Sequence, residues 1–289
     1  MNPPIVYFGP KPRLKTPPKA CECHSHFYGP EAVYPYAGGE GRRHHPDATI
    51  AEYRAVCAHL GIERSVIVHP SAYGIDNRRS VDAIRELGLD RARGIAACGP
   101  DITKPELAAL NAAGMRGVRI TRSGLANDLG IDDLPALAPR LADIGWHVQV
   151  QEDGAKALEW LPPLRGLPVP VVIDHIARLP KNMELNDPRF VALLRLLETG
   201  NVWLKISGPY HGSAQGHPYS DVVPRIHALA EVRPDRLVWA LNWPHPPFAP
   251  DNKPDAAACL DVLLDAVPDT ATRNAILADN PARLYGFPD

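Results

Sequence analysis

The sequence lacks long apolar stretches and a strong charge of either sign. No run among its 289 residues approaches the roughly 18 apolar residues that a membrane-spanning helix needs. The formal net charge is −2, from 31 Lys and Arg against 33 Asp and Glu, so we expect no overall attraction to nucleic acid or to a membrane surface. The composition points to a small-molecule partner that is recognised at a local site.

Cysteine is scarce, and no segment resembles an export signal. The five cysteines are an odd number and are scattered, apart from Cys21 and Cys23. Residues 1–19 are rich in proline and basic side chains but contain no apolar segment of signal-peptide length. We therefore expect reduced thiols and a cytoplasmic location.

Proline is abundant, at 32 residues, without forming low-complexity runs. It gathers in residues 1–18, 161–170 and 244–254, which we interpret as loops rather than linkers. No internal repeat or shift in composition marks a boundary. We predict an N-terminal proline-rich arm over residues 1–19 and a single catalytic domain over residues 20–289.

Eight short apolar or β-branched runs alternate with helical patterns. The expected strands are 20–27, 65–71, 92–98, 117–121, 147–151, 171–175, 202–207 and 237–242. The expected helices are 50–60, 77–87, 104–113, 134–144, 155–161, 188–199, 220–232, 255–266 and 270–279. Each strand-to-strand repeat spans about 25–40 residues, the size of a βαβ unit. We predict an α/β fold of the (β/α)8 TIM-barrel type, with a doubly wound open sheet as the alternative.

Polar residues accumulate where the expected strands end, which is where such barrels carry their active sites. They are His24, His26, His69, Ser71, Arg119, Arg122, Gln151, His175, Lys205, Ser207, Asn242 and His245. This convergence of imidazoles and cations on one rim is the main chemical signal in the sequence.

Three histidines form the candidate catalytic group. His24 and His26 are two residues apart on a strand, so their side chains point to the same face. Two adjacent imidazoles suit a metal site or an electrophilic clamp on a carbonyl group. We expect His175 to end the sixth strand, with Asp174 facing away from it.

Four segments carry a resemblance to a known family. They are His24-Ser25-His26-Phe27-Tyr28-Gly29-Pro30, Val172-Ile173-Asp174-His175, Trp203-Leu204-Lys205 and Trp243-Pro244-His245-Pro246. In this order they resemble the amidohydrolase superfamily, and most of all its 2-pyrone-4,6-dicarboxylate lactonase-like group. That group includes 4-sulfomuconolactone hydrolases and galactarolactone isomerases. The similarity covers nearly the whole chain and implies a TIM barrel of the amidohydrolase type.

The resemblance also implies roles for individual residues. His24, His26 and His175 match the histidines of the group's active site. Arg119 matches an arginine that clamps a substrate carboxylate, and Ser71 falls where a serine helps to bind the substrate.

Asn242 departs from the family pattern, which usually has an aspartate here. A carboxylate would ligate a metal ion or take a proton from water, and an amide does neither well. The galactarolactone isomerases also carry Asn-Trp-Pro-His at this point, but they lack the first histidine of the pair, present here as His24. An asparagine equally describes a hydrolase disabled by replacement of its aspartate.

The same residues decide the expected cofactor. A binuclear amidohydrolase site needs a lysine where this chain has Arg119, so we do not expect two metal ions. A single Zn²⁺ would be held by His24, His26 and either His175 or His211. The resemblance also includes metal-independent enzymes. We therefore expect either no required cofactor or one Zn²⁺.

Further side chains are candidates for substrate binding. Arg42 and Arg43 lie in a glycine-rich loop and, with Arg119 and Arg122, would form a cradle for a di-acid. Alternatively, the loop arginines are solvated surface. Arg178 is a candidate whose alternative is a surface salt bridge. Gln151 and Tyr210 are expected to bond a ring oxygen or a hydroxyl group.

Three functions follow from these residues. The first is a hydrolase that opens a carboxylated lactone, with histidines polarising the carbonyl and His175 or His245 acting as the base. The second is a lactone isomerase in which a substrate hydroxyl replaces water. The third is a barrel that binds an organic acid without turnover. A decarboxylase ranks last among the enzymes. The expected partner is a small carboxylated lactone, and a homo-oligomer is considered.

Overall fold

Eight parallel strands form one sheet in the sequential order β1 to β8. The computed structural model describes residues 9–38, 45–121, 129–249 and 251–288. The strands are β1 (Cys21–Ser25), β2 (Arg64–Val68), β3 (Ala92–Ala96), β4 (Met115–Thr121), β5 (His147–Gln151), β6 (Val171–Ile173), β7 (Val202–Ser207) and β8 (Leu237–Ala240). The predicted TIM barrel is confirmed. The doubly wound alternative is wrong, because such a sheet reverses its strand order.

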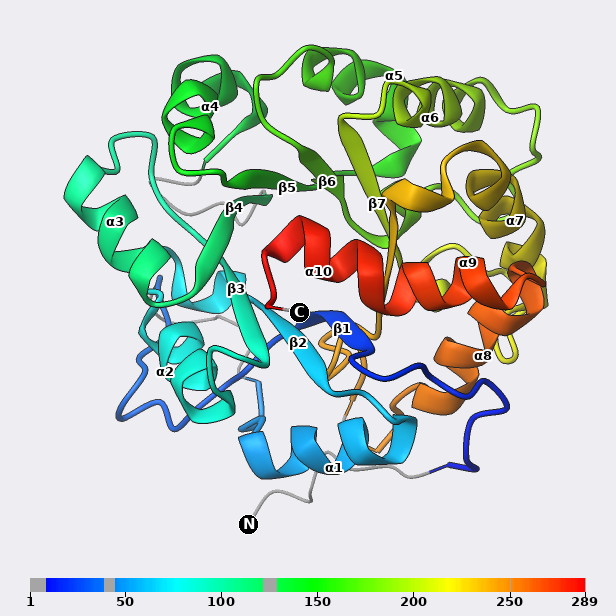
Figure 1. Cartoon of the computed structure of the whole chain (residues 1–289), viewed down its shortest axis with the longest axis horizontal. Helices are drawn as coiled ribbons and strands as arrows, with labels where there is room; N and C mark the ends of the chain where they lie inside the picture. The colour runs from blue at the N-terminus through cyan, green and yellow to red at the C-terminus, as the bar shows by residue number, and fades with distance from the viewer. Residues whose placement is uncertain (1–8, 39–44, 122–128, 250, 289) are drawn as a thin grey trace.

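Helices surround the ring of strands (Figure 1). They are α1 (Ile50–Leu60), α2 (Arg78–Leu87), α3 (Lys104–Ala112), α4 (Leu134–Ala142), α5 (Ala157–Trp160), α6 (Pro188–Glu198), α7 (Val223–Val232), α8 (Ala256–Ala266), α9 (Thr270–Asn274) and α10 (Asn280–Tyr285). Capping boxes begin α1, at Thr49 and Glu52, and α3, at Thr103 and Glu106. No described helix has the length and apolar character to cross a membrane.

The first and last strands meet through a few specific hydrogen bonds. The His26 N–H donates to the Trp243 carbonyl at 2.7 Å. The buried Glu22 carboxylate joins the same two strands, because its Oε1 accepts the N–H groups of His24 (2.9 Å) and Leu241 (2.8 Å). Glu22 thus fixes the backbone beside two of the candidate site residues.

The C-terminal segment closes the end of the barrel where the strands begin. In Figure 1, α10 lies across the ring of strands. Tyr285 and Phe287 are buried against Cys21 and Val66, and the Arg93 guanidinium lies 4.9 Å from the Phe287 ring centre. The expected helix over 270–279 is instead α9 followed by a π-helical segment, Ala275–Asp279, that leads into α10. Closure of this end leaves the carboxyl ends of the strands for the site.

The N-terminal segment packs on the outside of the barrel. Leu14 is buried, and Arg13 forms ion pairs with Asp261 and Asp265 of α8. The Thr16 hydroxyl donates to the carbonyl oxygen of Gly61, the residue that follows α1, at 2.7 Å. Residues 9–19 therefore contact two of the outer helices.

Five strands end earlier than the sequence predicts. β2 stops three residues before the expected position, and β1, β3, β6 and β8 stop two residues before it, so that His26, His175 and Asn242 lie just beyond their strands. The φ angles of His175 (52°) and Asn242 (67°) are in the left-handed region, which cannot continue a strand. Side chains in these turns therefore no longer alternate between two faces.

Candidate active site

The structure brings the three predicted catalytic histidines together inside the barrel. His24, His26 and His175 are all buried. The Nε2 atoms of His24 and His26 lie 3.1 Å apart, and the ring centres of His24 and His175 lie 4.7 Å apart. His211 extends this cluster, with its ring centre 5.1 Å from that of His175.

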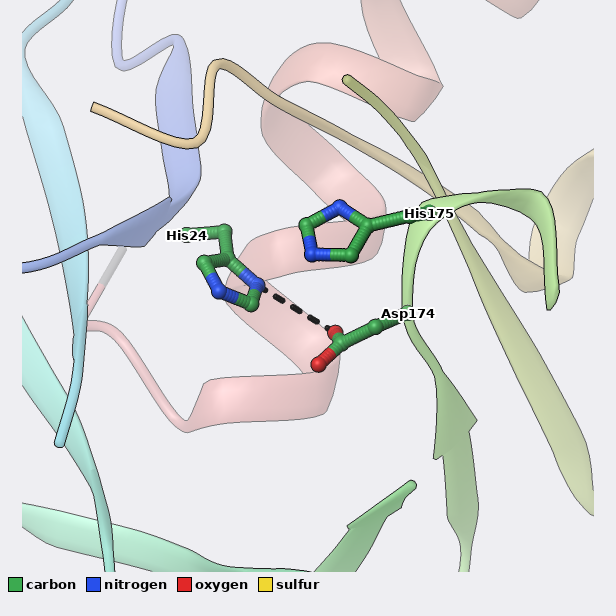
Figure 2. A group of neighbouring side chains, drawn as sticks. All are labelled: His24, Asp174 and His175. Atoms are coloured by element: carbon green, nitrogen blue, oxygen red, sulfur yellow. Dashed lines mark hydrogen bonds and ion pairs between the residues drawn. The ribbon is translucent and has the colours of Figure 1, made fainter. Parts of the chain in front are cut away.

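Asp174 belongs to the same cluster, so the expectation that it faces away from His175 is wrong. Its carboxylate points toward His24, and its Oδ1 lies 3.2 Å from His24 Nδ1 (Figure 2). β6 has already ended at Ile173, and the turn that follows places both side chains toward the barrel interior. His24, Asp174 and His175 offer ligand atoms within 4.8 Å of one another.

A buried lysine supports this aspartate. Lys205 Nζ lies 3.3 Å from Asp174 Oδ1 and 2.6 Å from Gln149 Oε1. The Gln149 amide donates to Asp174 Oδ2 at 2.8 Å. From the sequence, Lys205 is expected at the rim without a specific role, and Gln149 is not singled out. A lysine within an otherwise apolar buried strand was the signal that could have identified this support.

Burial sets the charge state of the cluster. It lowers the pKa of His24 to about 4 and holds the pKa values of His26 and His175 well below the usual range. Burial opposes ionisation of Asp174, but Lys205 and His24 still hold its pKa well below the usual range. At neutral pH the site therefore contains neutral imidazoles beside an ionised carboxylate.

The hydrogen bonds around the histidine pair define what it can bind. His26 Nδ1 lies 2.8 Å from the Val68 carbonyl and must donate to it, so its Nε2 is an acceptor. His24 Nδ1 lies 3.2 Å from Asp174 Oδ1 and 3.4 Å from Lys205 Nζ. The His24 proton is therefore either on Nδ1 and donated to Asp174, or on Nε2 and donated to His26 Nε2. In the first tautomer two acceptor nitrogens face one another at 3.1 Å, an arrangement that suits a cation between them.

The residues present fit a single metal ion. Zn²⁺ binds neutral imidazole nitrogen, and the separation of the two Nε2 atoms suits two ligands of one ion. His175 and Asp174 complete the candidate ligand group. The negative charge of Asp174 is already balanced by Lys205, and residue 242 adds no second carboxylate.

A cleft of about 960 Å³ contains four of the predicted substrate-binding residues. These are Ser71, Arg119, Gln151 and Arg178. The Arg119 guanidinium is held by the His69 carbonyl (2.6 Å) and by Gln151 Oε1 (3.3 Å). His211 lines the cleft and also contacts His175, so the cleft adjoins the buried histidines. Lys156 and Trp160 line it as well, and the sequence did not mark either one.

The remaining predicted residues form a separate chain of hydrogen bonds. The Asn242 amide donates to the Tyr210 hydroxyl at 2.8 Å, and that hydroxyl lies 3.1 Å from His245 Nδ1. Tyr210 is thus already bonded to two neighbours. Arg42 and Arg122 lie outside the described residues.

A closed parallel barrel with buried histidines at the carboxyl ends of its strands defines an amidohydrolase-type protein. The chain belongs to the amidohydrolase family, whose model matches residues 21–287. The resemblance noted in the sequence is therefore confirmed.

Three similar proteins place the chain within the family. It is 38% identical over 290 residues to 4-sulfomuconolactone hydrolase of Rhizobium radiobacter, covering 96% of this chain and 95% of the relative. It is 32% identical to D-galactarolactone isomerase of Agrobacterium fabrum, covering 96% and 94%. Its structure matches that of a probable 2-pyrone-4,6-dicarboxylic acid hydrolase from Acinetobacter baumannii with bound citric acid. That match has a TM-score of 0.77 and 25% identity, and it covers 93% of this chain and all of the other.

Proposed function

We propose that this protein hydrolyses a small carboxylated lactone. The observation that carries the proposal is a polar cleft, with Arg119 and Arg178 in its lining beside four acidic residues, that adjoins a buried cluster of neutral imidazoles. Such a cleft binds a carboxylate, while the imidazoles act on a neighbouring carbonyl group. The relatives support this proposal, since two are named as hydrolases of lactone-type acids.

Arg119 positions the substrate. Its guanidinium is held in place by His69 and Gln151, and it donates to the substrate carboxylate as a planar pair of N–H groups. Holding the carboxylate in this way places the lactone carbonyl beside the histidines, so that water attacks an oriented centre.

The histidines carry the chemical step. Ser207 Oγ lies 2.8 Å from His175 Nδ1. In the tautomer in which Nδ1 accepts the hydroxyl proton, His175 Nε2–H donates to the carbonyl oxygen as negative charge develops there. Water adds to the carbonyl carbon and loses a proton to the His24–His26 pair. The ring C–O bond then breaks, and the leaving oxygen takes up that proton. A Zn²⁺ ion, if held by the three histidines, would polarise the carbonyl group in place of the hydrogen bond from His175.

Lactone isomerisation is the second candidate. Asn242 supplies no anionic base, and a substrate hydroxyl held close to the carbonyl needs less activation than water does. The 32% identity to D-galactarolactone isomerase favours the same alternative. The same site would then act on a substrate whose own hydroxyl group is the nucleophile.

Turnover in ¹⁸O-labelled water separates the two reactions. We would incubate the protein with 4-sulfomuconolactone, 2-pyrone-4,6-dicarboxylate and galactarolactone, and analyse the products by mass spectrometry. Hydrolysis places one labelled oxygen in the product, whereas isomerisation places none. A product without label would overturn hydrolysis, and the absence of turnover on every lactone would overturn the proposed function.

Metal dependence is tested on the same reaction. We expect activity to persist after dialysis against a chelator, because the chain's own residues supply the hydrogen bonds and the proton acceptor. Metal content is measured before and after dialysis. A loss of activity that added Zn²⁺ restores would instead show that a metal ion is required.

A further inference from the structure

A hydrogen-bonded chain of three side chains lies where two strands end. Tyr210 lies in the 3₁₀ turn Pro209–His211 that follows β7, whereas Asn242 and His245 lie in the segment that follows β8. The Tyr210 hydroxyl joins them, at 2.8 Å from Asn242 Nδ2 and 3.1 Å from His245 Nδ1. Asn242 and His245 are both buried, and Tyr210 is half-buried.

The chemistry of each group determines which side chain donates and which accepts in this series of hydrogen bonds. An amide nitrogen only donates, so the Tyr210 oxygen accepts from Asn242. The hydroxyl group keeps its own proton to donate, and His245 Nδ1 at 3.1 Å is the neighbour that can accept it. Burial and the neighbouring Lys253 lower the pKa of His245 to about 3, so its ring is neutral. His245 therefore carries its proton on Nε2.

The same bonds fix the amide of Asn242. With Nδ2 held by Tyr210, the carbonyl oxygen Oδ1 is turned away from Tyr210, and no described residue donates a hydrogen bond to it. The carbonyl of the next residue, Trp243, accepts the backbone N–H of His26 at 2.7 Å. Asn242 therefore lies at the same end of the barrel as the histidine pair, and its Oδ1 is an acceptor for which no described donor is present.

We infer that Tyr210 is a positioning residue that orients the Asn242 amide so that Oδ1 accepts the O–H of the attacking nucleophile. The catalytic part of this inference rests on the proposed function. Asn242 orients the water or hydroxyl group without removing its proton, which passes to the imidazoles. Tyr210 acts through Asn242 rather than on the substrate.

The direction of the chain depends on the residue at position 242. An aspartate carboxylate only accepts, so Tyr210 would donate its proton to it. The Tyr210 oxygen would then accept from His245 Nδ1–H, and the imidazole proton would move from Nε2 to Nδ1. The tautomer of His245 is therefore a spectroscopic signature of the orientation of residue 242.

¹⁵N-histidine NMR tests the direction of these hydrogen bonds without any substrate. The His245 signals are assigned from their absence in His245→Gln. We expect the Nε2–H tautomer in the unmodified protein and the Nδ1–H form in Asn242→Asp. An Nδ1–H tautomer in the unmodified protein, or the same tautomer in both proteins, would overturn the directed chain.

Kinetics test the positioning role on a lactone that the protein converts. Tyr210→Phe should lower kcat about tenfold, as expected for the loss of one orienting hydrogen bond, with KM within about twofold. The same change should have no effect in an Asn242→Ala background. Tyr34→Phe is the matched control, because its hydroxyl bonds Asp82 away from the site.

Two results would contradict the role. A Tyr210→Phe effect on KM alone would make Tyr210 a substrate contact, and an undiminished effect in the Asn242→Ala background would make it a general structural residue. If no lactone is converted, the proposed function fails, while the NMR result still decides the direction of the chain.

Discussion

At the scale of single residues, Arg119 shows how a side chain in a barrel strand becomes a recognition group. Its neighbours His69 and Gln151 hold the guanidinium in one orientation before substrate arrives. An arginine held in this way loses little conformational entropy on binding a carboxylate. Lysine has the same charge but cannot form the same planar pair of hydrogen bonds.

We therefore expect Arg119→Lys to lower kcat/KM by about 10- to 100-fold, chiefly through KM, because a bidentate charged bond is lost. Steady-state kinetics on the lactone that the protein converts measure this effect. Arg85→Lys is the control, since Arg85 is 76% exposed and pairs with the nearby Asp82. An unchanged KM in Arg119→Lys would show that this residue does not hold the substrate carboxylate.

At the scale of elements, an ion pair inside the barrel connects β7 with the turn after β6. Lys205 and Asp174 are both fully buried, and Gln149 of β5 bonds to each of them. A buried charge without its partner is costly, whereas removal of both charges leaves neither one unpaired.

Asp174→Asn and Lys205→Met should each lower the free energy of unfolding by about 3–5 kcal/mol. The double variant should be clearly more stable than the sum of the two losses implies. Urea unfolding of the three variants measures this coupling, with Arg78→Met, which removes an exposed ion pair with Asp76, as the control. Additive losses would show that the two charges do not depend on one another.

At the scale of the whole molecule, seven of the histidines that the structure describes have pKa values lowered by burial. They are His24, His26, His69, His147, His175, His211 and His245. Below the ordinary value of 6.5 the unfolded chain binds protons that the folded chain does not, so the stability of the fold decreases as the pH falls. Each such group contributes up to about 1.4 kcal/mol per pH unit.

The melting temperature should therefore fall steeply between pH 6.5 and pH 4, which differential scanning calorimetry measures. His147→Gln should make the decline shallower, because the pKa of His147 is lowered to about 3 and the residue lies in β5, outside the cleft. A melting temperature that stays constant from pH 6.5 to pH 5 would contradict this expectation.

The fold was predictable because its signals are local. Each buried strand is a short apolar run, and each helix repeats its apolar residues at helical spacing. Eight such repeats leave few arrangements other than a barrel. The ends of the strands were less predictable. His175 and Asn242 have left-handed backbone angles that cannot continue a strand, but no change in the apolar pattern of the sequence marks these positions.

The site was predictable in part for the same reason. His24, His26 and Arg119 follow from strand position, since the carboxyl ends of parallel strands meet at one end of a barrel. Asp174 was assigned the wrong direction because strand alternation was extended past Ile173 into a turn. Lys205 and Gln149 needed the packed structure, since their partners lie on different strands.

The sequence by itself determined the barrel and the residue types at its active end, including an asparagine where the family usually has an aspartate. Only the tertiary structure decided which groups meet. It turned Asp174 toward His24, paired it with Lys205, and bonded Tyr210 to Asn242 rather than leaving its hydroxyl to the substrate. The reason is physical: a hydrogen bond depends on atoms a few ångströms apart, and residues distant in the chain reach that separation only once the barrel has closed.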